Sequence, residues 1–383
     1  MKPVTNRTIL FTEACPLHCR YCYLEKPGTY GTADAMENER ILEEVRKIHE
    51  EVDPKEYLCI LTLTGGEPFT RPDLIKEIMT TYGNRFIYEF NTSGYLLDEE
   101  MIQFLAGYPV RFVLSVDGDR RLTDYLRPVR GTKYHNGYMK KMEEVFPSLL
   151  YYFPLTECKF IIHPRYVDLI HRLYLFAEQV GFRRISYILD FRTRPSEPTH
   201  GQKPWTDEDT EALKEQFVLI AQEFASGIAK GIWRPIVRQI ESTMRVLLTN
   251  PQGFDPATDL TCGLSTGRGL TTMYDPERSK FCMSKDFETV NDAIEKIRKT
   301  YIECDGKCPW DPECGAFPVC LRTNCPKNGF DAHGNLLKFE ELECAVSKAA
   351  YEAAIMLMYY CNDPEIKSVY WNEYLRTLLK GVS

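Results

Sequence analysis

The sequence contains no stretch of about 18 consecutive apolar residues, the length that a helix needs to cross a bilayer. Its first residues, MKPVTNRTILFTEAC, have neither a long apolar region nor a small-residue cleavage site, so no secretory signal is expected. Positive charge is also scarce, because 47 Lys and Arg against 55 Asp and Glu give a net charge of −8. We therefore expect a cytoplasmic protein with neither nucleic acid nor a membrane among its partners.

The chain also lacks internal repeats and low-complexity tracts. Its 383 residues exceed what one compact domain usually holds, so we expect one large domain and a smaller one. A chain of this size in a reducing compartment does not depend on disulfides, so its 14 cysteines favour metal binding. Three of them lie at 15–22 and eight between 262 and 344. This distribution predicts two metal-rich regions around a metal-poor middle.

Short apolar runs alternate with helix-like segments over the first 190 residues. The runs are rich in Ile, Val, Phe and Tyr, and the alternation indicates parallel βαβ units. Six strands are too few to close an eight-stranded TIM barrel, so we expect an α/β fold with an open or partial (β/α)6 barrel. The expected strands are 7–12, 57–64, 86–92, 111–117, 158–163 and 185–191, and the expected helices are 36–52, 72–82, 98–106, 133–145 and 167–180.

Active sites in such folds lie at the carboxyl ends of the strands. Four polar or glycine-rich tips meet this condition. They are the cysteine loop EACPLHCRYCYLEK after the first strand, GGEP after the second, NTSG after the third and SVDG at the fourth. The sequence therefore predicts that these four segments form one site.

The cysteine loop has the spacing C-x3-C-x2-C, through Cys15, Cys19 and Cys22. Three thiolates on a [4Fe–4S] cube leave one iron open for another ligand. Zinc is the competing interpretation, but structural zinc takes four ligands, and His18 inside the loop is poorly placed to be the fourth. We favour the iron–sulfur interpretation.

The loop resembles the signature of the radical S-adenosylmethionine (SAM) enzymes, and GGEP and SVDG match further motifs of that family in the same order. Either motif alone fits an ordinary turn, so it is the joint order that carries the resemblance. It implies that SAM occupies the open iron of a [4Fe–4S] cluster on Cys15, Cys19 and Cys22. In that family the reduced cluster injects an electron and cleaves SAM to a 5′-deoxyadenosyl radical.

The resemblance also implies which residues contact SAM. Glycines allow close approach of the backbone to a ligand, and the Glu67 carboxylate would accept a hydrogen bond from the ammonium group of SAM. Arg127, twelve residues after Ser115, would pair with the carboxylate of SAM, and Tyr21 would lie beside adenine. The expected cofactor-binding residues are Tyr21, Gly65, Gly66, Glu67, Ser93, Ser115, Asp117, Arg127 and Leu189.

The second cysteine group resembles the SPASM extension of radical SAM enzymes that modify peptides and proteins. Its eight members suit two auxiliary [4Fe–4S] clusters, with a zinc-bearing region as the alternative. The pair Cys304/Cys308 and the four-residue gap after Cys320 depart from that family, so the assignment of ligands to each cluster stays open. We sort Cys262, Cys282 and Cys325 to the nearer cluster and mainly the others to the farther one. The full set of expected ligands is Cys262, Cys282, Cys304, Cys308, Cys314, Cys320, Cys325 and Cys344. Cys59, Cys158 and Cys361 are expected to be buried apolar residues.

The domain organisation follows from these regions. Residues 1–191 are expected to form the radical SAM partial barrel, and 255–345 an irregular SPASM-like domain organised by metal. Between them, 192–254 contain a Pro-rich linker and two helices, about 206–229 and 234–249, the first opened by a capping pair of Thr206 and Asp209. Helices at about 345–360 and 367–380 make up the last segment, 346–383.

The resemblance is strongest to the anaerobic sulfatase-maturating enzymes and to the maturases of ribosomally made peptides. The sulfatase-maturating enzymes carry an aspartate base directly after the cysteine corresponding to Cys282, whereas this chain has Met283. Asp286 is a weak candidate to replace it, and the catalytic base is otherwise unassigned. This departure favours peptide maturation of another kind over formylglycine formation.

We therefore expect a radical SAM enzyme, an oxidoreductase that abstracts hydrogen from a peptide or protein side chain and gives a thioether, a carbon–carbon crosslink or another oxidative modification. Its implied cofactors are SAM and three [4Fe–4S] clusters, and its partners are the peptide or protein substrate and an electron donor such as flavodoxin or ferredoxin. The alternatives are a sulfatase-type maturase, a SPASM-like dehydrogenase of a small molecule, and a non-catalytic electron-transfer protein.

Overall fold

The computed structural model describes residues 4–22, 37–131, 137–189, 205–249, 271–272, 290–324, 333–339, 341–362 and 369–380. The chain divides into two compact units. The first comprises Met1–Phe160 with Gln179–Arg183 and Leu270–Cys282. The second comprises Ile161–Glu178, Arg184–Gly269 and Met283–Ser383.

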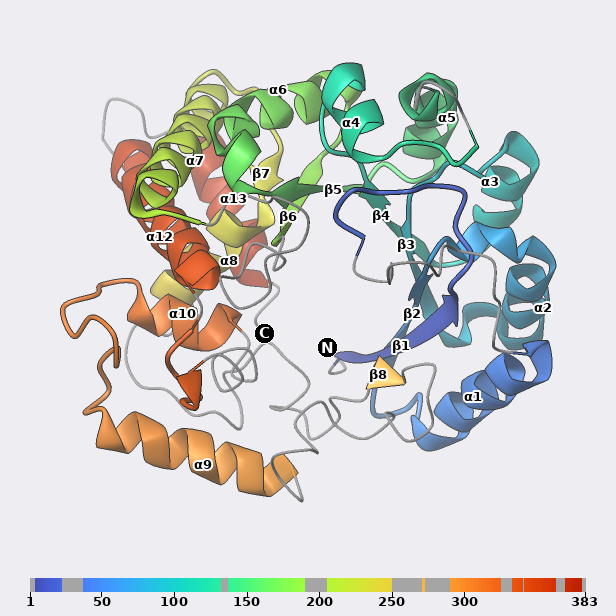
Figure 1. The fold of residues 1–383 in the computed structure, drawn as a ribbon, viewed down its shortest axis with the longest axis horizontal. Coiled ribbons are helices and arrows are strands. Elements are labelled where there is room, and N and C mark those ends of the chain that lie inside the picture. Colours follow the sequence, from blue (N-terminus) through green and yellow to red (C-terminus); the bar gives the residue numbers. More distant parts are fainter. Residues whose placement is uncertain are drawn as a thin grey trace. The chain divides into compact units, whose positions relative to one another are not determined.

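The first unit is built on a parallel sheet whose neighbouring strands follow the order β8, β1, β2, β3, β4, β5. Helices α1, α2 and α3 lie along the outer side of β1 to β4 (Figure 1). The strands are β1 (Val4–Thr12), β2 (Leu58–Gly65), β3 (Ile87–Thr92), β4 (Val110–Ser115), β5 (Glu157–Ile162) and β8 (Thr271–Thr272). The helices are α1 (Asn38–Glu51), α2 (Pro72–Tyr82), α3 (Glu99–Leu105), α4 (Arg120–Leu126) and α5 (Tyr138–Tyr152), with short 3-10 turns at Pro68–Thr70 and Gly83–Arg85.

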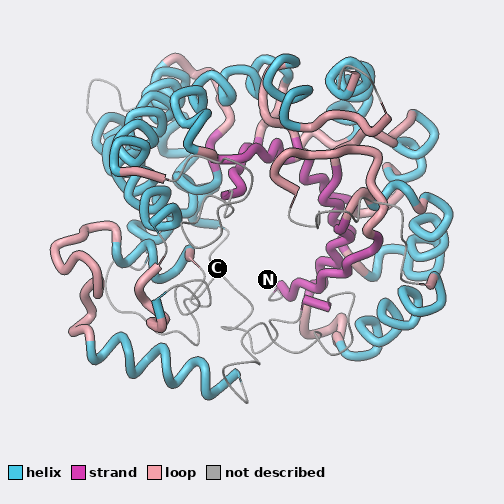
Figure 2. The backbone as a smooth tube through the Cα atoms, in the orientation of Figure 1, coloured by secondary structure: helices cyan, strands magenta, loops and turns pink. Residues whose placement is uncertain are grey.

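Local sequence signals place these helices directly after the strand tips. The Asp98 side chain caps α3 by accepting from the Met101 amide at 2.9 Å, and Asp119 caps α4 in the same way. The strand register pairs Thr12 with Gly65, so β1 and β2 end side by side. Because the strands are parallel, their carboxyl ends meet at one edge of the sheet. Figure 2 shows the strands in magenta with helices around them.

The second unit contains a short parallel pair, β6 (Arg184–Leu189) and β7 (Ile236–Val237), and a set of long helices. Helices α7 and α12 pack together closely, and α12 buries several small residues that include Ala349, Ala353 and Ala354. The helices are α6 (Ile170–Val180), α7 (Asp207–Ala229), α8 (Arg238–Thr249), α9 (Val290–Glu303), α10 (Phe317–Thr323), α12 (Glu341–Asn362) and α13 (Val369–Lys380), with a 3-10 turn at Pro164–Leu169.

The α/β class and the six strands expected from the sequence are confirmed, with ends displaced by three residues at most. Thr206 and Asp209 form the expected capping box at the start of α7. Two helices, α9 and α10, lie in the segment that was expected to be irregular. Among the described residues, no helix is long and apolar enough to cross a membrane.

Candidate active site

The cysteine loop after β1 is held against the segment that follows α4, far away in the sequence. The amide of His18 donates to the carbonyl of Pro128 at 2.8 Å. The amide of Arg20 donates to the carbonyl of Leu126 at 2.9 Å. These antiparallel backbone bonds fix the thiol-bearing loop beside the end of α4.

The two glycines of GGEP let the tip of β2 approach the start of this loop. The Gly66 amide donates to the Thr12 carbonyl at 2.7 Å. A Cβ atom on Gly65, whose φ is +138°, would lie 2.1 Å from the Thr12 oxygen. One on Gly66 would lie 2.3 Å from the Ala14 oxygen. Here the glycines are required for contact between two segments of backbone, in addition to any approach to a ligand.

Glu67 is fully buried and holds the tips of β2 and β3 together. Its carboxylate accepts from the Thr92 hydroxyl at 2.6 Å and from the Phe69 amide at 3.3 Å. It also accepts from both the amide and the hydroxyl of Ser93, the amide at 2.8 Å. Burial raises the pKa of Glu67, and the hydrogen bonds from Ser93 and Thr92 oppose that rise. The expected role in binding the ammonium group of SAM must therefore compete with a complete set of protein donors.

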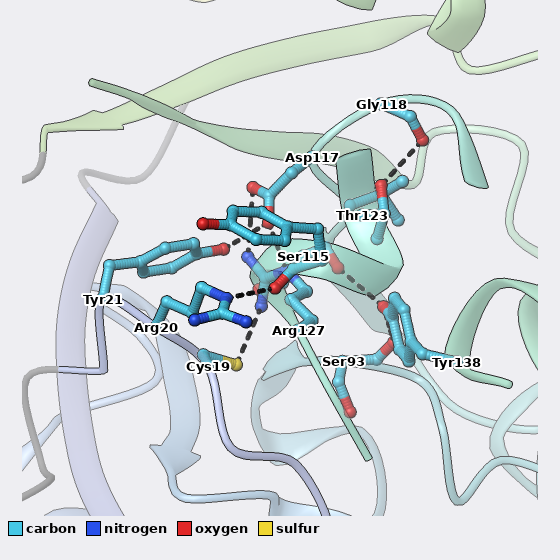
Figure 3. A network of polar contacts seen from close by, with 12 residues as sticks. Cys19, Arg20, Tyr21, Ser93, Ser115, Asp117, Gly118, Thr123, Arg127 and Tyr138 are labelled. Carbon is cyan, nitrogen blue, oxygen red and sulfur yellow. Dashed lines mark hydrogen bonds and ion pairs between the residues drawn. The ribbon is translucent and has the colours of Figure 1, made fainter. Parts of the chain in front are cut away.

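Arg127 and Asp117 form a buried ion pair next to the cysteine loop (Figure 3). The Nε atom of Arg127 donates to Asp117 Oδ2 at 2.7 Å, and Nη1 lies 3.9 Å from Cys19 Sγ. The Tyr21 hydroxyl donates to the same carboxylate oxygen, and the guanidinium carbon lies 5.1 Å from the centre of the Tyr21 ring. Burial alone lowers the pKa of Arg127, but the charge of Asp117 raises it well above its usual range. The structure thus brings together four residues that the sequence assigned to the site.

Tyr138, at the start of α5, connects the tips of β3 and β4. Its hydroxyl lies 2.6 Å from the carbonyl oxygen of Ser93 and 2.7 Å from that of Ser115 (Figure 3). The side chain is fully buried, and burial raises its pKa well above the usual range. Sequence reasoning missed this residue because no motif marks it. Thr92 could have been predicted from the sequence, since it belongs to the NTSG tip.

The three thiols of the loop fit an iron–sulfur cluster by their chemistry. Burial raises the pKa of Cys15, and the nearby charges of Glu67, Cys19 and Cys22 raise it further. The Leu17 amide lies 3.5 Å from Cys15 Sγ and donates to it. Bringing several thiols together in a partly buried site is unfavourable for thiolates alone, and a metal centre compensates by binding them. Cys15, Cys19 and Cys22 are therefore the residues that would hold the cluster.

A second thiol group lies in the second unit, where α10 and α12 meet the turn before α10. Burial raises the pKa of Cys320, and the charges of Cys344, Cys314 and Cys308 raise it further. Burial likewise raises the pKa of Cys344 to about 11, with Cys314 and Cys308 again as neighbours. A cavity of about 560 Å³ is lined by Cys308 and Cys344. We call Cys308, Cys314, Cys320 and Cys344 the four-thiol group.

Cys304 follows α9 directly, and burial raises its pKa together with the charges of Glu303 and Cys308. Over the described ranges, no three His, Cys, Asp or Glu side chains are placed to hold a single metal ion. The ligands of one zinc ion must all meet at a single atom, whereas each cysteine of a [4Fe–4S] cube binds a different iron. The four ligands of a cube therefore lie farther apart than those of a zinc ion. Cys59, Cys158 and Cys361 are buried, as expected.

Several expected site residues cannot be placed. Leu189 is the last residue of β6, and the structure describes its backbone only. The remaining ones lie outside the described residues: Cys262, Cys282, Met283, Asp286 and Cys325.

Comparison with known families decides the class of the first unit. Residues 9–148 match the radical SAM superfamily. This segment is a radical SAM domain. The matched segment contains the cysteine loop, the glycine pair and the Arg127–Asp117 pair, so the geometry above is that of a radical SAM domain.

Solved structures extend the likeness of this chain beyond that segment. The structure of anSMEcpe with bound AdoMet, a SPASM-type sulfatase maturase, is similar at 16% identity and a TM-score of 0.65, over 94% of this chain and 99% of that one. The structure of the same protein with bound AdoMet and the Cp18Cys peptide is similar at 17% identity and a TM-score of 0.67, again over 94% of this chain and 99% of that one. The structure of SuiB from Streptococcus suis with bound S-adenosylmethionine is similar at 14% identity and a TM-score of 0.48, over 71% of this chain and 57% of that one. The likeness to anSMEcpe shows a shared fold, a radical SAM partial barrel followed by a cysteine-rich region.

Proposed function

We propose that this radical SAM enzyme cleaves SAM reductively and abstracts hydrogen from a side chain of a peptide or protein, giving an oxidative modification such as a thioether or carbon–carbon crosslink. When bound, the cluster supplies the electron that cleaves SAM. The observation that carries the proposal is the pairing of the cysteine loop with the segment after α4. This pairing places Cys19 beside Tyr21, Asp117 and Arg127 at the carboxyl edge of the strands.

The residues of the edge have distinct tasks in this proposal. Asp117 orients Arg127, which keeps further N–H donors for the carboxylate of SAM. Tyr21 offers its ring to the adenine of SAM while its hydroxyl stays on Asp117. Glu67 fixes Ser93 and the tips of β2 and β3, so it acts on SAM through the backbone that it holds.

The four-thiol group is proposed to bind an auxiliary [4Fe–4S] cluster with all four positions taken by protein. Cys262, Cys282 and Cys325 are proposed for another cluster, as the sequence suggests. The cavity beside Cys308 and Cys344 provides room for a group larger than one ion. An electron acceptor of this kind would take the second electron of a two-electron oxidation, and a flavodoxin or ferredoxin would supply the first.

A peptide substrate is supported by the shared fold, since anSMEcpe is seen with a peptide bound. That likeness covers nearly the whole of both chains, so a sulfatase-type maturase is the second candidate. Met283 stands where that enzyme type needs a base, and a thioether cannot take up a proton usefully.

The two candidates are separated by incubating the reconstituted enzyme with SAM, a reductant and a Cys-containing sulfatase peptide. We expect SAM cleavage without conversion of the peptide cysteine to formylglycine, as followed by mass spectrometry. A peptide product whose mass matches thiol-to-aldehyde conversion would replace our first candidate by the second. A Met283→Asp variant is the matched comparison, because it restores the missing carboxylate at the same position.

A further inference from the structure

Lys348 lies on α12 one helical turn after Cys344, so the two side chains share a helix face. Its ammonium group is held by Asp311, with Nζ 3.4 Å from Oδ2. Cys308, Cys344, Asp311 and Lys348 line the same cavity of about 560 Å³. A cation is therefore held beside the four-thiol group by a carboxylate from the turn that carries Cys308 and Cys314.

Charge in this cavity is unevenly distributed. Its described lining contains three carboxylates, Asp207, Asp311 and Glu341, and Lys348 is the one cation among the described lining residues. The Lys348 side chain is about one third exposed, at 31%. The ion pair with Asp311 favours the protonated ammonium form of this side chain.

We propose that Lys348 is a positioning residue that raises the reduction potential of the cluster on Cys308, Cys314, Cys320 and Cys344. A cube bound by four thiolates is anionic, and reduction adds one more negative charge. A fixed cation nearby stabilises the reduced form more than the oxidised form, and a fixed anion does the opposite. Lys348 therefore makes this cluster a better electron acceptor, and Asp311 both orients the ammonium group and limits its effect.

This inference rests on the proposed function, because it requires a cluster on the four-thiol group. The test measures cluster content first and potential second, so the two can fail separately. Iron and sulfide are counted in the anaerobically reconstituted full chain. The signal of this cluster is identified by electron paramagnetic resonance as the one altered in Cys314→Ala. Its midpoint potential is then measured by redox titration.

We expect Lys348→Met to retain its iron and to shift the oxidised-to-reduced ratio about tenfold toward oxidised at fixed potential, which is about 59 mV for one electron. Lys348→Arg keeps the charge and should stay close to the unmodified chain. Asp311→Asn removes a negative charge and should move the potential in the opposite direction. Lys76→Met is the matched control, because Lys76 is similarly exposed and ion-paired, with Glu100 in the first unit.

Unchanged potentials in Lys348→Met and Asp311→Asn, with the cluster present, would overturn the role of Lys348 and leave the cluster standing. A chain with no signal altered in Cys314→Ala would overturn both the cluster and this inference. If Lys348→Met loses iron, the Asp311→Asn variant becomes the test of the electrostatic role. A midpoint potential that does not rise in Asp311→Asn would contradict that role. Equal shifts in Lys348→Met and Lys76→Met would also contradict it.

Discussion

Glu67 accepts hydrogen bonds from Thr92, Phe69 and both donors of Ser93 while it is fully excluded from solvent. Each of these donors would lose its partner if the carboxylate were removed, and an unsatisfied buried donor costs about 1–3 kcal/mol. The residue therefore contributes to the stability of the strand tips before any ligand binds.

We expect Glu67→Gln to lower the melting temperature of the reconstituted chain by several degrees. The glutamine NH2 group is a donor and cannot accept the hydrogen bonds that Ser93 donates to the carboxylate. Differential scanning fluorimetry under anaerobic conditions measures this. Glu100→Gln, at an exposed partner of Lys76, is the control and should leave the melting temperature unchanged. A normal melting temperature for Glu67→Gln with weakened SAM binding would instead make Glu67 a direct ligand contact.

Arg127 has two tasks that a single substitution would confuse. Removing it leaves Asp117 as an uncompensated buried charge, which costs about 3–5 kcal/mol. Removing it also takes away the proposed partner of the SAM carboxylate, a charge-assisted bond with a net value of about 1.5–3 kcal/mol. A second substitution at Asp117 separates these effects.

We expect Arg127→Ala to lower both thermal stability and SAM affinity. The double variant Arg127→Ala with Asp117→Asn should regain most of the stability, because no buried charge is then unpaired, while SAM affinity stays low. Fluorimetry and equilibrium dialysis with labelled SAM report the two quantities. Recovery of SAM affinity together with stability would show that Arg127 acts on SAM only through Asp117.

At the scale of elements, the cysteine loop depends on the contact between the tips of β1 and β2. Gly66→Ala should prevent the loop from closing, since the added Cβ would meet the Ala14 oxygen at 2.3 Å. We expect the reconstituted variant to lose about four irons and the activity that depends on them. Gly107→Ala is the matched control, because its Cβ would meet its nearest neighbour, the Phe104 oxygen, at an ordinary 3.4 Å. A Gly66→Ala chain with full iron content would contradict this account of the loop.

The strands were predictable because each is a short run of large apolar residues with a helix-like segment after it. The start of α7 was predictable too, since Thr206 and Asp209 carry a capping signal in their residue types. Helix α4 was missed because it is only seven residues long, and α9 because the cysteines and prolines around it were read as irregular chain.

The motifs placed the expected site residues at the strand tips, but they did not show how the side chains pair with one another. The sequence assigned Arg127 and Asp117 to SAM binding, but it could not show that they form an ion pair with each other. That pairing depends on how the end of α4 packs against the segment that follows β4. The grouping of Cys308, Cys314, Cys320 and Cys344 was open for a similar reason, since these cysteines come from the turn before α10, from α10 and from α12.

At the scale of the whole molecule, we expect the two thiol regions to bind metal independently, because each draws its described thiols from one unit. We expect the anaerobically reconstituted chain to hold about twelve irons with matching sulfide, as three cubes require. Replacing Cys15, Cys19 and Cys22 by Ala should lower this to about eight. Iron analysis near four in the unmodified chain would remove the auxiliary clusters, and substantial zinc in protein isolated without reconstitution would favour a zinc-organised second region.

Reductive cleavage of SAM distinguishes a radical SAM enzyme from a non-catalytic iron–sulfur protein. The reconstituted chain is incubated with SAM and dithionite, and 5′-deoxyadenosine is quantified by liquid chromatography. We expect cleavage by the unmodified chain and none by the variant with Cys15, Cys19 and Cys22 all changed to Ala, while that variant keeps the spectroscopic signals of its C-terminal clusters. Formation of 5′-deoxyadenosine by the triple variant, or its absence from the fully loaded unmodified chain, would contradict the account.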